Sequence, residues 1–247
     1  MKQYFNINLE FNTKVVDCTI KKAILDKKKG YVCVIDGNVL ATTHVDFKFR
    51  EIINNGLVNL CDGSSIALLA GKIHKQKFNT YTGPDIFAKY VNENYKQYFL
   101  GNTKENLDRI KNRFTELGYD IARYKFESLP YKNVEDFDYI TIAKNINSFS
   151  PDIIWVSLGA PKQEIFISNL YPFIDRGILF AIGAAFNIYL GDLENKRTSS
   201  VFRRIHLEWL FRIFKEPKKQ IGRVIFFLKY LPAIVFEELK KKKESGH

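Results

Sequence analysis

Residues 151–167 read PDIIWVSLGAPKQEIFI, and this stretch decides the fold. Its first part, residues 152–158, is a run of β-branched and aromatic side chains with the length of a buried strand. The run stops at Gly159 and Pro161, where glycine relaxes the backbone angles and proline removes a hydrogen-bond donor. Because Pro161 suits the first turn of a helix, the stretch predicts a strand, a sharp turn and a helix.

Three polar side chains stand at the start of that predicted helix: Lys162, Gln163 and Glu164. The N-terminus of a helix offers free N–H groups and a positive dipole end to an anion. In an open α/β sheet, ligands bind at the carboxyl ends of the strands. The residues alone leave two interpretations open, a ligand-binding loop or an ordinary corner with solvated polar side chains.

The same order of strand, polar turn and helix recurs along the chain. This alternation predicts an α/β fold with a Rossmann-like, mainly parallel sheet and helices on both faces. A chain of 247 residues can bury one such core and carry an appendage. Further buried strands are predicted at residues 31–35, 57–61, 97–100, 120–124 and 177–182, and an edge strand at residues 4–11.

Small and polar residues follow several of these strands. Asn38 and Asp62 follow the first two buried strands, Gly101 follows the third, and Asp85 opens a helix after a Gly-Pro corner. A carboxylate ahead of a helix is either an N-cap or a catalytic base, and capping is the commoner use. A single glycine before a helix is only a weak sign of phosphate binding.

Two sequence features bear on metal binding. Asp136 and Asp138 have the D-x-D spacing of some metal sites, but they stand in an acidic loop ahead of a helix, which favours solvated N-terminal charges. The three cysteines are widely spaced and lack histidine partners, which argues against zinc and for reduced thiols. We therefore expect no metal.

The positive charge gathers at the end of the sequence. Residues 196–247 carry 14 Lys/Arg and 5 Asp/Glu, so they hold most of the net charge of +11. Apolar residues recur there at helical spacing, which predicts two basic amphipathic helices, at residues 201–215 and from Lys218 onward. Such helices suit an anionic membrane surface, and the alternative is a helix pair docked on the domain with solvated charges. We predict a catalytic domain at 1–196 and a basic appendage at 197–247 that meets the membrane without crossing it.

Other function classes compete with these expectations. A basic tail also suits a nucleic-acid-binding protein without enzyme activity, although no RNA-binding motif or repeated aromatic platform is present. A dehydrogenase on the same sheet is a third class, which the absence of G-x-G-x-x-G after the early strands disfavours.

Six stretches of the sequence, taken in order, form a recognisable set: LCDGSSIALLAG, TGPDIF, WVSLGAPKQE, FAIGAAFNIYLG, KRTSS and HLEWLFRIFKEPKKQIGR. Together they resemble the WecG/TagA/CpsF family of bacterial glycosyltransferases, and the resemblance extends over about residues 31–223. It implies an inverting, metal-independent transfer of a hexose or N-acetylhexosamine, N-acetylmannosamine or glucose for example, from a UDP-sugar to an undecaprenyl-pyrophosphate-linked sugar. The product would belong to a cell-surface polysaccharide or teichoic acid. The UDP-sugar is a substrate and no cofactor is implied.

The resemblance also implies a place in the cell and roles for residues. It implies a peripheral protein on the inner face of the cytoplasmic membrane, with the tail closing over the active site. It implies no nucleic acid partner, and a homo-oligomer remains an open alternative. Asp62 matches the proposed general base. The residues that match or are expected at the substrate-binding edge are Asn38, Asp85, Gly101, Gly159, Gln163, Glu164, Arg197, Arg212 and Arg223.

The sequence departs from the family pattern at several positions. Ser65, Thr80 and Asn187 stand where the family often has glycine, arginine and aspartate, and Ser199 and Val201 replace proline and tryptophan of an arginine-containing motif. These departures leave the expected reaction class intact, but they weaken any prediction of which sugar is bound.

Overall fold

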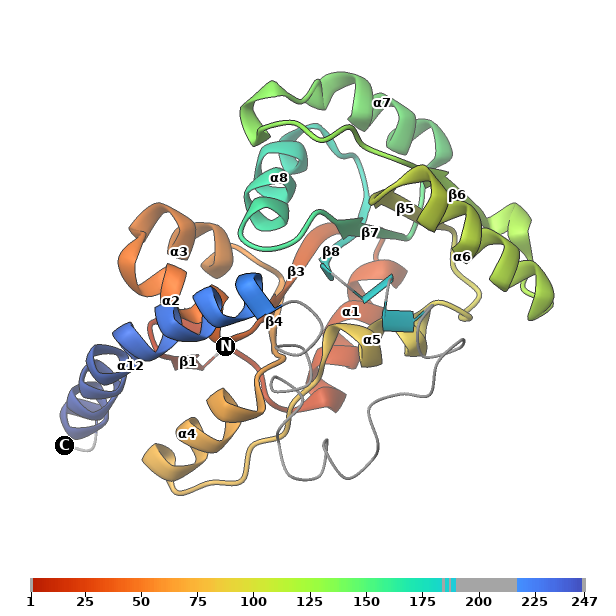
Figure 1. Cartoon of the computed structure of the whole chain (residues 1–247). Coiled ribbons are helices and arrows are strands. Elements are labelled where there is room, and N and C mark those ends of the chain that lie inside the picture. Colours follow the sequence, from red (N-terminus) through yellow and green to blue (C-terminus); the bar gives the residue numbers. More distant parts are fainter. Residues whose placement is uncertain (1, 184, 187, 190–216, 246–247) are drawn as a thin grey trace.

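A computed structural model describes residues 2–183, 185, 186, 188, 189 and 217–245 (Figure 1). Its centre is a six-stranded sheet in the order β4-β3-β8-β7-β5-β6, and every pairing in it is parallel. This confirms the predicted α/β fold. The strands are β3 (Lys29–Ile35), β4 (Val58–Cys61), β5 (Gln97–Gly101), β6 (Tyr124–Glu127), β7 (Ile153–Ser157) and β8 (Gly177–Ala181).

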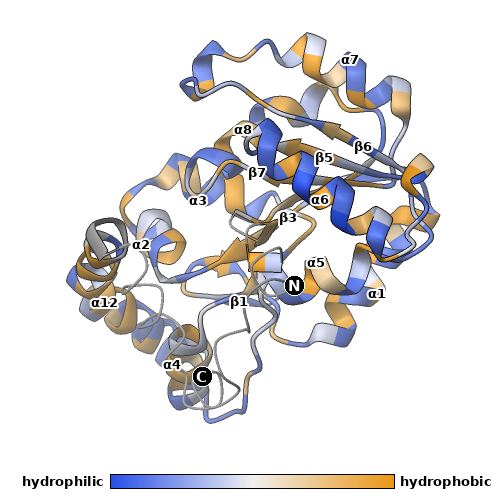
Figure 2. Ribbon diagram, turned by 45° about the vertical axis from the view of Figure 1, so that its right-hand side comes forward, coloured by the Kyte–Doolittle hydropathy of each residue, from blue (hydrophilic) through white to orange (hydrophobic). Residues whose placement is uncertain are grey.

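Helices cover both faces of this sheet, and each face has its own hydrophobic core. Side chains alternate between the faces along each strand, so Val156 of β7 belongs to one core and Trp155 to the other. Figure 2 shows the hydrophobic residues gathered along the central strands. The Val156 side carries α2 (Gly37–Val45), α3 (Phe47–Asn54), α4 (Ser64–His74), α7 (Tyr139–Phe149) and α8 (Lys162–Leu170), and the Trp155 side carries α1 (Thr13–Leu25), α5 (Gly83–Tyr90) and α6 (Lys104–Glu116).

Two strand predictions were wrong in detail. Residues 4–11 do not form one edge strand, because Phe5 and Asn6 adopt positive φ angles and turn the chain into a hairpin of β1 (Gln3–Tyr4) and β2 (Ile7–Asn8). Residues 121–123 form a 3₁₀ turn, η1 (Ile121–Arg123), because the Asp120 side chain accepts a hydrogen bond from the N–H of Ala122, and β6 begins only at Tyr124.

The predicted second tail helix is present as α12 (Pro217–Ser245), whereas the predicted helix at 201–215 lies outside the described residues. α12 continues through Pro232 and packs on α2 and α4. The Phe227 ring lies on Gly37, where a Cβ atom would come within 3.0 Å of the ring, and Ile234 is buried in the core. No helix in the described part of the chain is both long and apolar enough to cross a bilayer.

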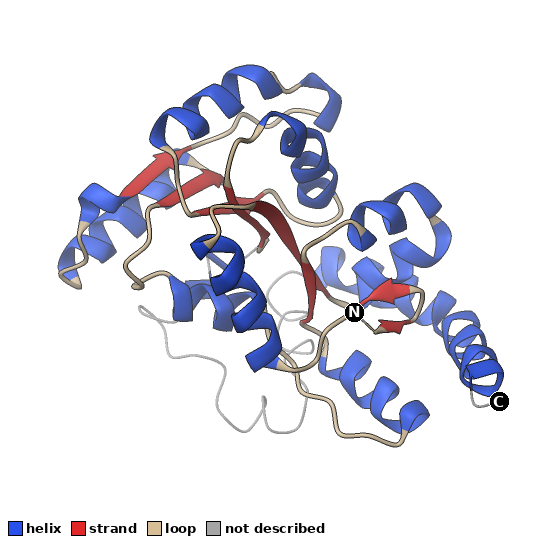
Figure 3. Cartoon of the chain, turned by 180° about the vertical axis from the view of Figure 1, so that it is seen from behind, coloured by secondary structure: helices blue, strands red, loops and turns tan. Residues whose placement is uncertain are grey.

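Two acidic residues of α12 fasten it to the N-terminal hairpin, which Figure 3 shows beside the helix. The buried Glu238 accepts a hydrogen bond from the N–H of Phe5 at 2.7 Å, and its other oxygen lies 2.8 Å from Nε2 of His74. The Asn6 amide donates to Glu237 at 2.9 Å. α12 is therefore docked on the α/β domain, while its outer face stays exposed.

Candidate active site

The carboxylate of Asp62 lies at the carboxyl end of the sheet, directly after β4. Its N–H donates to the carbonyl of Ile35 at 3.0 Å, and its Oδ1 accepts a hydrogen bond from the N–H of Gly83 at 3.1 Å. The interpretation of Asp62 as a cap of the following helix was wrong, because α4 begins at an N-cap Gly63 that has no side-chain cap. Asp62 instead reaches the first residue of α5, where the helix dipole favours a negative charge. Asp62 is only partly buried among the described residues.

Other predicted residues on this side serve their own helices. Asp36 caps α2 by accepting from the N–H of Val39 at 2.8 Å, and Asn38 lies in the first turn of that helix. Asp85 accepts a hydrogen bond from the Thr82 hydroxyl at 2.6 Å, and that hydroxyl accepts from the N–H of Asp85. This reciprocal pair fixes the start of α5, close to the Gly83 N–H that Asp62 binds.

Gln163 joins two turns at the carboxyl edge. Its Oε1 accepts hydrogen bonds from the N–H of Gly159 at 3.1 Å and of Gly183 at 2.9 Å, and its Nε2 donates to Glu164 at 2.9 Å. Only 4% of Gln163 is exposed. The turn after β7 is thus tied to the turn after β8 through a single buried amide.

Glu164 is fully buried, and its Oε2 has no hydrogen-bond partner among the described residues. Burial raises the pKa of this carboxyl to about 7, and the nearby Asp36 adds to the rise, while the hydrogen bond from Gln163 and the charge of Arg223 act against it. Near neutral pH a large share of the Glu164 carboxyl groups therefore carry a proton.

Arg223 brings α12 to the same edge of the sheet. One of its guanidinium nitrogens donates to the carbonyl of Ala160, in the turn after β7, at 3.1 Å. The structure thus brings Arg223 together with Gln163 and Glu164. Arg197 and Arg212 lie outside the described residues.

The two predicted glycines at this edge differ in their surroundings. Gly101 has φ +89°, and a Cβ atom there would meet the carbonyl oxygen of Ser157 at 2.9 Å, so the strand packing demands glycine. Gly159 has φ +78°, and no described heavy atom lies within 4 Å of the place where its Cβ would be. The turn at Gly159 therefore leaves room for a ligand to approach the backbone.

Sequence reasoning missed a polar chain across the middle of the sheet. The Ser157 hydroxyl donates to the carbonyl of Gly183 at 2.6 Å, and the Asn102 amide lies 3.4 Å from that hydroxyl. Asn102 adopts a positive φ directly after β5. Each of these residues ends a strand or follows one, and that position was the signal that could have found them.

The metal interpretation of residues 136–138 finds no support in the local geometry. Asp138 caps α7 by accepting from both the N–H and the hydroxyl of Thr141, and these hydrogen bonds lower the pKa of its carboxyl. Within the described ranges, no group of three His, Cys, Asp or Glu side chains is placed to hold a metal ion. Cys33 and Cys61 are buried free thiols whose pKa burial raises, so they stay protonated.

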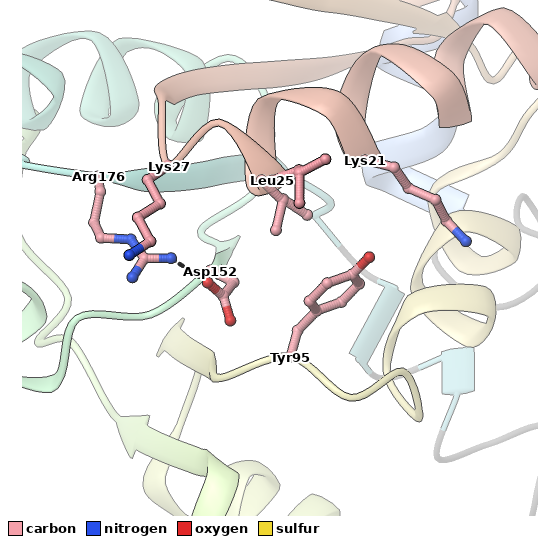
Figure 4. Close-up of a pocket in the computed structure, with 7 residues that line it drawn as sticks. Lys21, Leu25, Lys27, Tyr95, Asp152 and Arg176 are labelled. Atoms are coloured by element: carbon pink, nitrogen blue, oxygen red, sulfur yellow. Dashed lines mark hydrogen bonds and ion pairs between the residues drawn. The ribbon is translucent and has the colours of Figure 1, made fainter.

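A pocket of about 270 Å³ lies away from this edge (Figure 4). Asp152 and Arg176, which directly precede β7 and β8, form an ion pair in it, and Lys27 lies beside them. The pocket therefore opens at the amino ends of the strands. We assign it to the packing of α1 against the sheet and not to the candidate site.

The parallel sheet, with the Asp62 carboxylate and a buried polar network at its strand ends, defines an α/β fold of the kind in which ligands usually bind at the carboxyl edge. The family model for the glycosyl transferase WecG/TagA/CpsF family matches residues 6–245, and the chain belongs to this family. It is a glycosyltransferase. The family assignment goes against the alternative of a nucleic-acid-binding protein without enzyme activity.

Three relatives carry the name N-acetylglucosaminyldiphosphoundecaprenol N-acetyl-beta-D-mannosaminyltransferase. The protein of Bacillus subtilis strain 168 is 26% identical over 243 residues, which cover 97% of this chain and 91% of that protein. The protein of Bacillus spizizenii strain W23 is 24% identical over 228 residues, covering 89% and 84%. The protein of Staphylococcus aureus strain MW2 is 26% identical over 208 residues, covering 83% and 76%.

Proposed function

We propose that the protein transfers an N-acetylhexosamine such as N-acetylmannosamine, or a hexose, from a UDP-sugar to a sugar linked to undecaprenyl pyrophosphate, with inversion and without a metal. The family assignment and the names of the three relatives support the acceptor and the sugar class. The observation that carries the proposal is the place of Asp62, partly exposed at the carboxyl edge and held by the N-terminus of α5.

In this mechanism the Asp62 carboxylate takes the proton of the acceptor hydroxyl. The hydroxyl oxygen attacks the anomeric carbon, the bond from that carbon to the UDP phosphate oxygen breaks, and UDP leaves with the bonding electrons. General-base assistance of this kind is worth about two to four powers of ten in rate. Asp62 is suited to this step because its carboxylate lies at the carboxyl edge of the sheet, held by the N–H of Gly83 at the start of α5.

The departing diphosphate needs positive charge in a site that excludes water. Arg223 stands at the turn after β7, which has room at Gly159, and we propose that it faces the diphosphate there. We propose the same role for Arg197 and Arg212. In this proposal residues 1–196 bind the nucleotide-sugar, and residues 197–247 complete the site.

The acceptor is borne by a lipid, so the enzyme has to work at a membrane surface. The outer face of α12 exposes Ile225, Leu228 and Phe236, with the exposed Lys229 and Lys240 beside them. An apolar stripe flanked by lysines suits a helix that lies in the headgroup region of an anionic bilayer. We therefore propose a peripheral protein on the inner face of the cytoplasmic membrane, with α12 as its contact.

The test is turnover of Asp62→Asn with a panel of UDP-sugars and a short-chain lipid-pyrophosphate acceptor. The amide keeps the shape but cannot take the proton, so we expect kcat to fall at least about a hundredfold. Asp108→Asn, on the exposed side of α6, is the matched control and should turn over like wild type. Near-normal turnover of Asp62→Asn would remove Asp62 as the base.

A further inference from the structure

Half of the large exposed apolar side chains in the described part of the chain belong to one group of neighbouring helices. Of the 14 large hydrophobic side chains that are exposed among the described residues, seven lie on α12 or at the corner between α2 and α3. Figure 1 shows these three helices together on one side of the sheet. Five of the seven belong to α12, and the other two are Val45 and Phe47.

The corner between α2 and α3 is a rigid one. Asp46 is both the C-cap of α2 and the N-cap of α3, and its carboxylate accepts a hydrogen bond from the N–H of Phe49 at 3.0 Å. On either side of it, Val45 is 47% and Phe47 is 62% exposed. The Arg50 guanidinium lies 5.1 Å from the centre of the Phe47 ring. The chain thus holds two apolar side chains outward instead of folding them into the core that lies beneath.

His44, directly before this corner, contacts α12. The His44 ring lies 5.9 Å from the ring of Tyr230, and its Nδ1 lies 3.6 Å from the carboxylate of Glu237. On α12, the exposed Phe236 directly precedes Glu237. Val45 therefore directly follows, and Phe47 lies close in sequence to, a side chain that contacts α12.

The charges around this surface have the sign that an anionic bilayer attracts. Lys48 is exposed directly after Phe47, and residues 217–247 contain eight Lys/Arg against three Glu. Glu237 and Glu238 are engaged with the hairpin and with the two histidines, and Asp46 caps α3. Acidic headgroups thus meet mainly lysines, the carboxylates of Asp46, Glu237 and Glu238 are held by protein groups, and Glu51 is an exposed carboxylate one turn after Phe47.

We propose that Val45 and Phe47 enter the headgroup region of an anionic bilayer beside α12, so that the α/β domain itself holds the membrane. This inference rests on the proposed membrane contact of α12. One helix lying on a bilayer is free to roll about its axis, whereas a second contact at its flank fixes the roll. The carboxyl edge of the sheet would then keep a constant tilt toward the lipid-linked acceptor.

Phe47→Trp tests the inference directly. The full-length variant is mixed with phosphatidylglycerol vesicles whose acyl chains are brominated, and its fluorescence is compared with wild type, which contains two tryptophans. We expect the added indole to be quenched and its emission to shift to the blue. Leu25→Trp is the control, because Leu25 is 81% exposed at the end of α1, beside the pocket at the amino ends of the strands. Quenching beyond that of wild type in both variants, or in neither, overturns the inference.

A second measurement uses sedimentation with the same lipids without bromine. The double variant Val45→Ser/Phe47→Ser should bind the vesicles about tenfold more weakly. The effect is moderate because only the exposed half of each side chain is free to transfer apolar area from water into the bilayer. Its turnover with a detergent-solubilised acceptor should equal that of wild type, and Leu25→Ser should change neither.

Ile225→Ser/Phe236→Ser separates the inference from the proposed function. If this α12 variant loses vesicle binding while Val45→Ser/Phe47→Ser binds like wild type, α12 remains the membrane contact and the corner does not share it. If the wild-type protein does not bind the vesicles at all, the proposed membrane contacts of α12 and of the corner are both wrong. The proposed sugar transfer, which is measured in detergent, does not depend on this result.

Discussion

At the scale of single residues, Glu164 is the most unusual group in the site. It follows Gln163 in a helix that starts at a surface turn, yet it is fully buried, with one oxygen unpartnered among the residues that the structure describes. Its raised pKa has a consequence for stability. Between about pH 4.5 and about pH 7 the folded protein keeps a proton that the unfolded chain has released, so stability falls as the pH rises through this window.

Glu164→Gln should remove this dependence on pH. The amide retains an oxygen that accepts from Gln163 and never ionises, so it avoids the cost of a buried charge. We compare the difference in free energy of unfolding between the variant and wild type at two pH values. This difference should shift in favour of the variant by ~2 kcal/mol from about pH 5 to about pH 8. Urea unfolding at the two pH values measures it. Glu51→Gln, an exposed control on α3, should show no such trend, and an equal difference at both pH values for Glu164→Gln would contradict the assignment.

The positions of the candidate residues could be predicted from the sequence, but their partners could not. Asp62, Gln163 and Glu164 follow strands, and that pattern alone places them at one edge of the sheet. Whether Asp62 caps its own helix or reaches another depends on where α5 starts, and this is set by packing between segments far apart in the chain. The burial of Glu164 likewise depends on tertiary packing, which the polar run at the start of α8 does not reveal.

At the scale of elements, α12 is the part whose structure differs most from what its sequence suggests. Its sequence predicts a basic amphipathic helix from Lys218 onward and leaves open whether the helix lies on a membrane or docks on the domain, and the structure shows one helix of 29 residues with a buried inner face. The reason is that its partners lie far away in the chain, with Phe5 and Glu238 separated by 233 positions. Periodicity identified the helix, but no local pattern could identify that docking.

Glu238→Ala should therefore be costly. It leaves the N–H of Phe5 buried without its acceptor and removes the partner of His74, so we expect the free energy of unfolding to fall by about 2–4 kcal/mol. Glu244→Ala, near the exposed end of the same helix, should change it by less than about 0.5 kcal/mol. Chemical denaturation gives both values. Equal effects of the two substitutions would mean that Glu238 does not fasten α12.

At the scale of the whole molecule, the alternation of strands and helices was enough to predict a parallel sheet covered on both faces. The strand order β4-β3-β8-β7-β5-β6 was not predicted, because it depends on how far each connection crosses the sheet. The link from β4 to β5 passes β3, β8 and β7 before it pairs, and nothing in a local pattern encodes that distance.

The distribution of acidic side chains over the molecule bears on the metal. Asp138 caps α7, Asp85 pairs with Thr82, and Asp62 accepts from Gly83, so these carboxylates are spread over separate helix starts. We expect turnover to be unchanged when EDTA is added in excess over trace divalent cations. The measurement is UDP release with and without chelator, followed by addition of Mg²⁺ or Mn²⁺. A loss of turnover that either ion restores would contradict this expectation and make Asp136 and Asp138 candidate metal ligands.

The bond between Phe5 and Glu238 also sets an order of events during synthesis. The hairpin is synthesised well before the carboxylate that completes it, because Phe5 and Glu238 are 233 positions apart. A nascent chain therefore carries a hairpin whose Phe5 N–H lacks this acceptor until α12 emerges from the ribosome. The same helix carries the exposed apolar stripe, so the step that completes the hairpin also brings that stripe into place on the α/β domain.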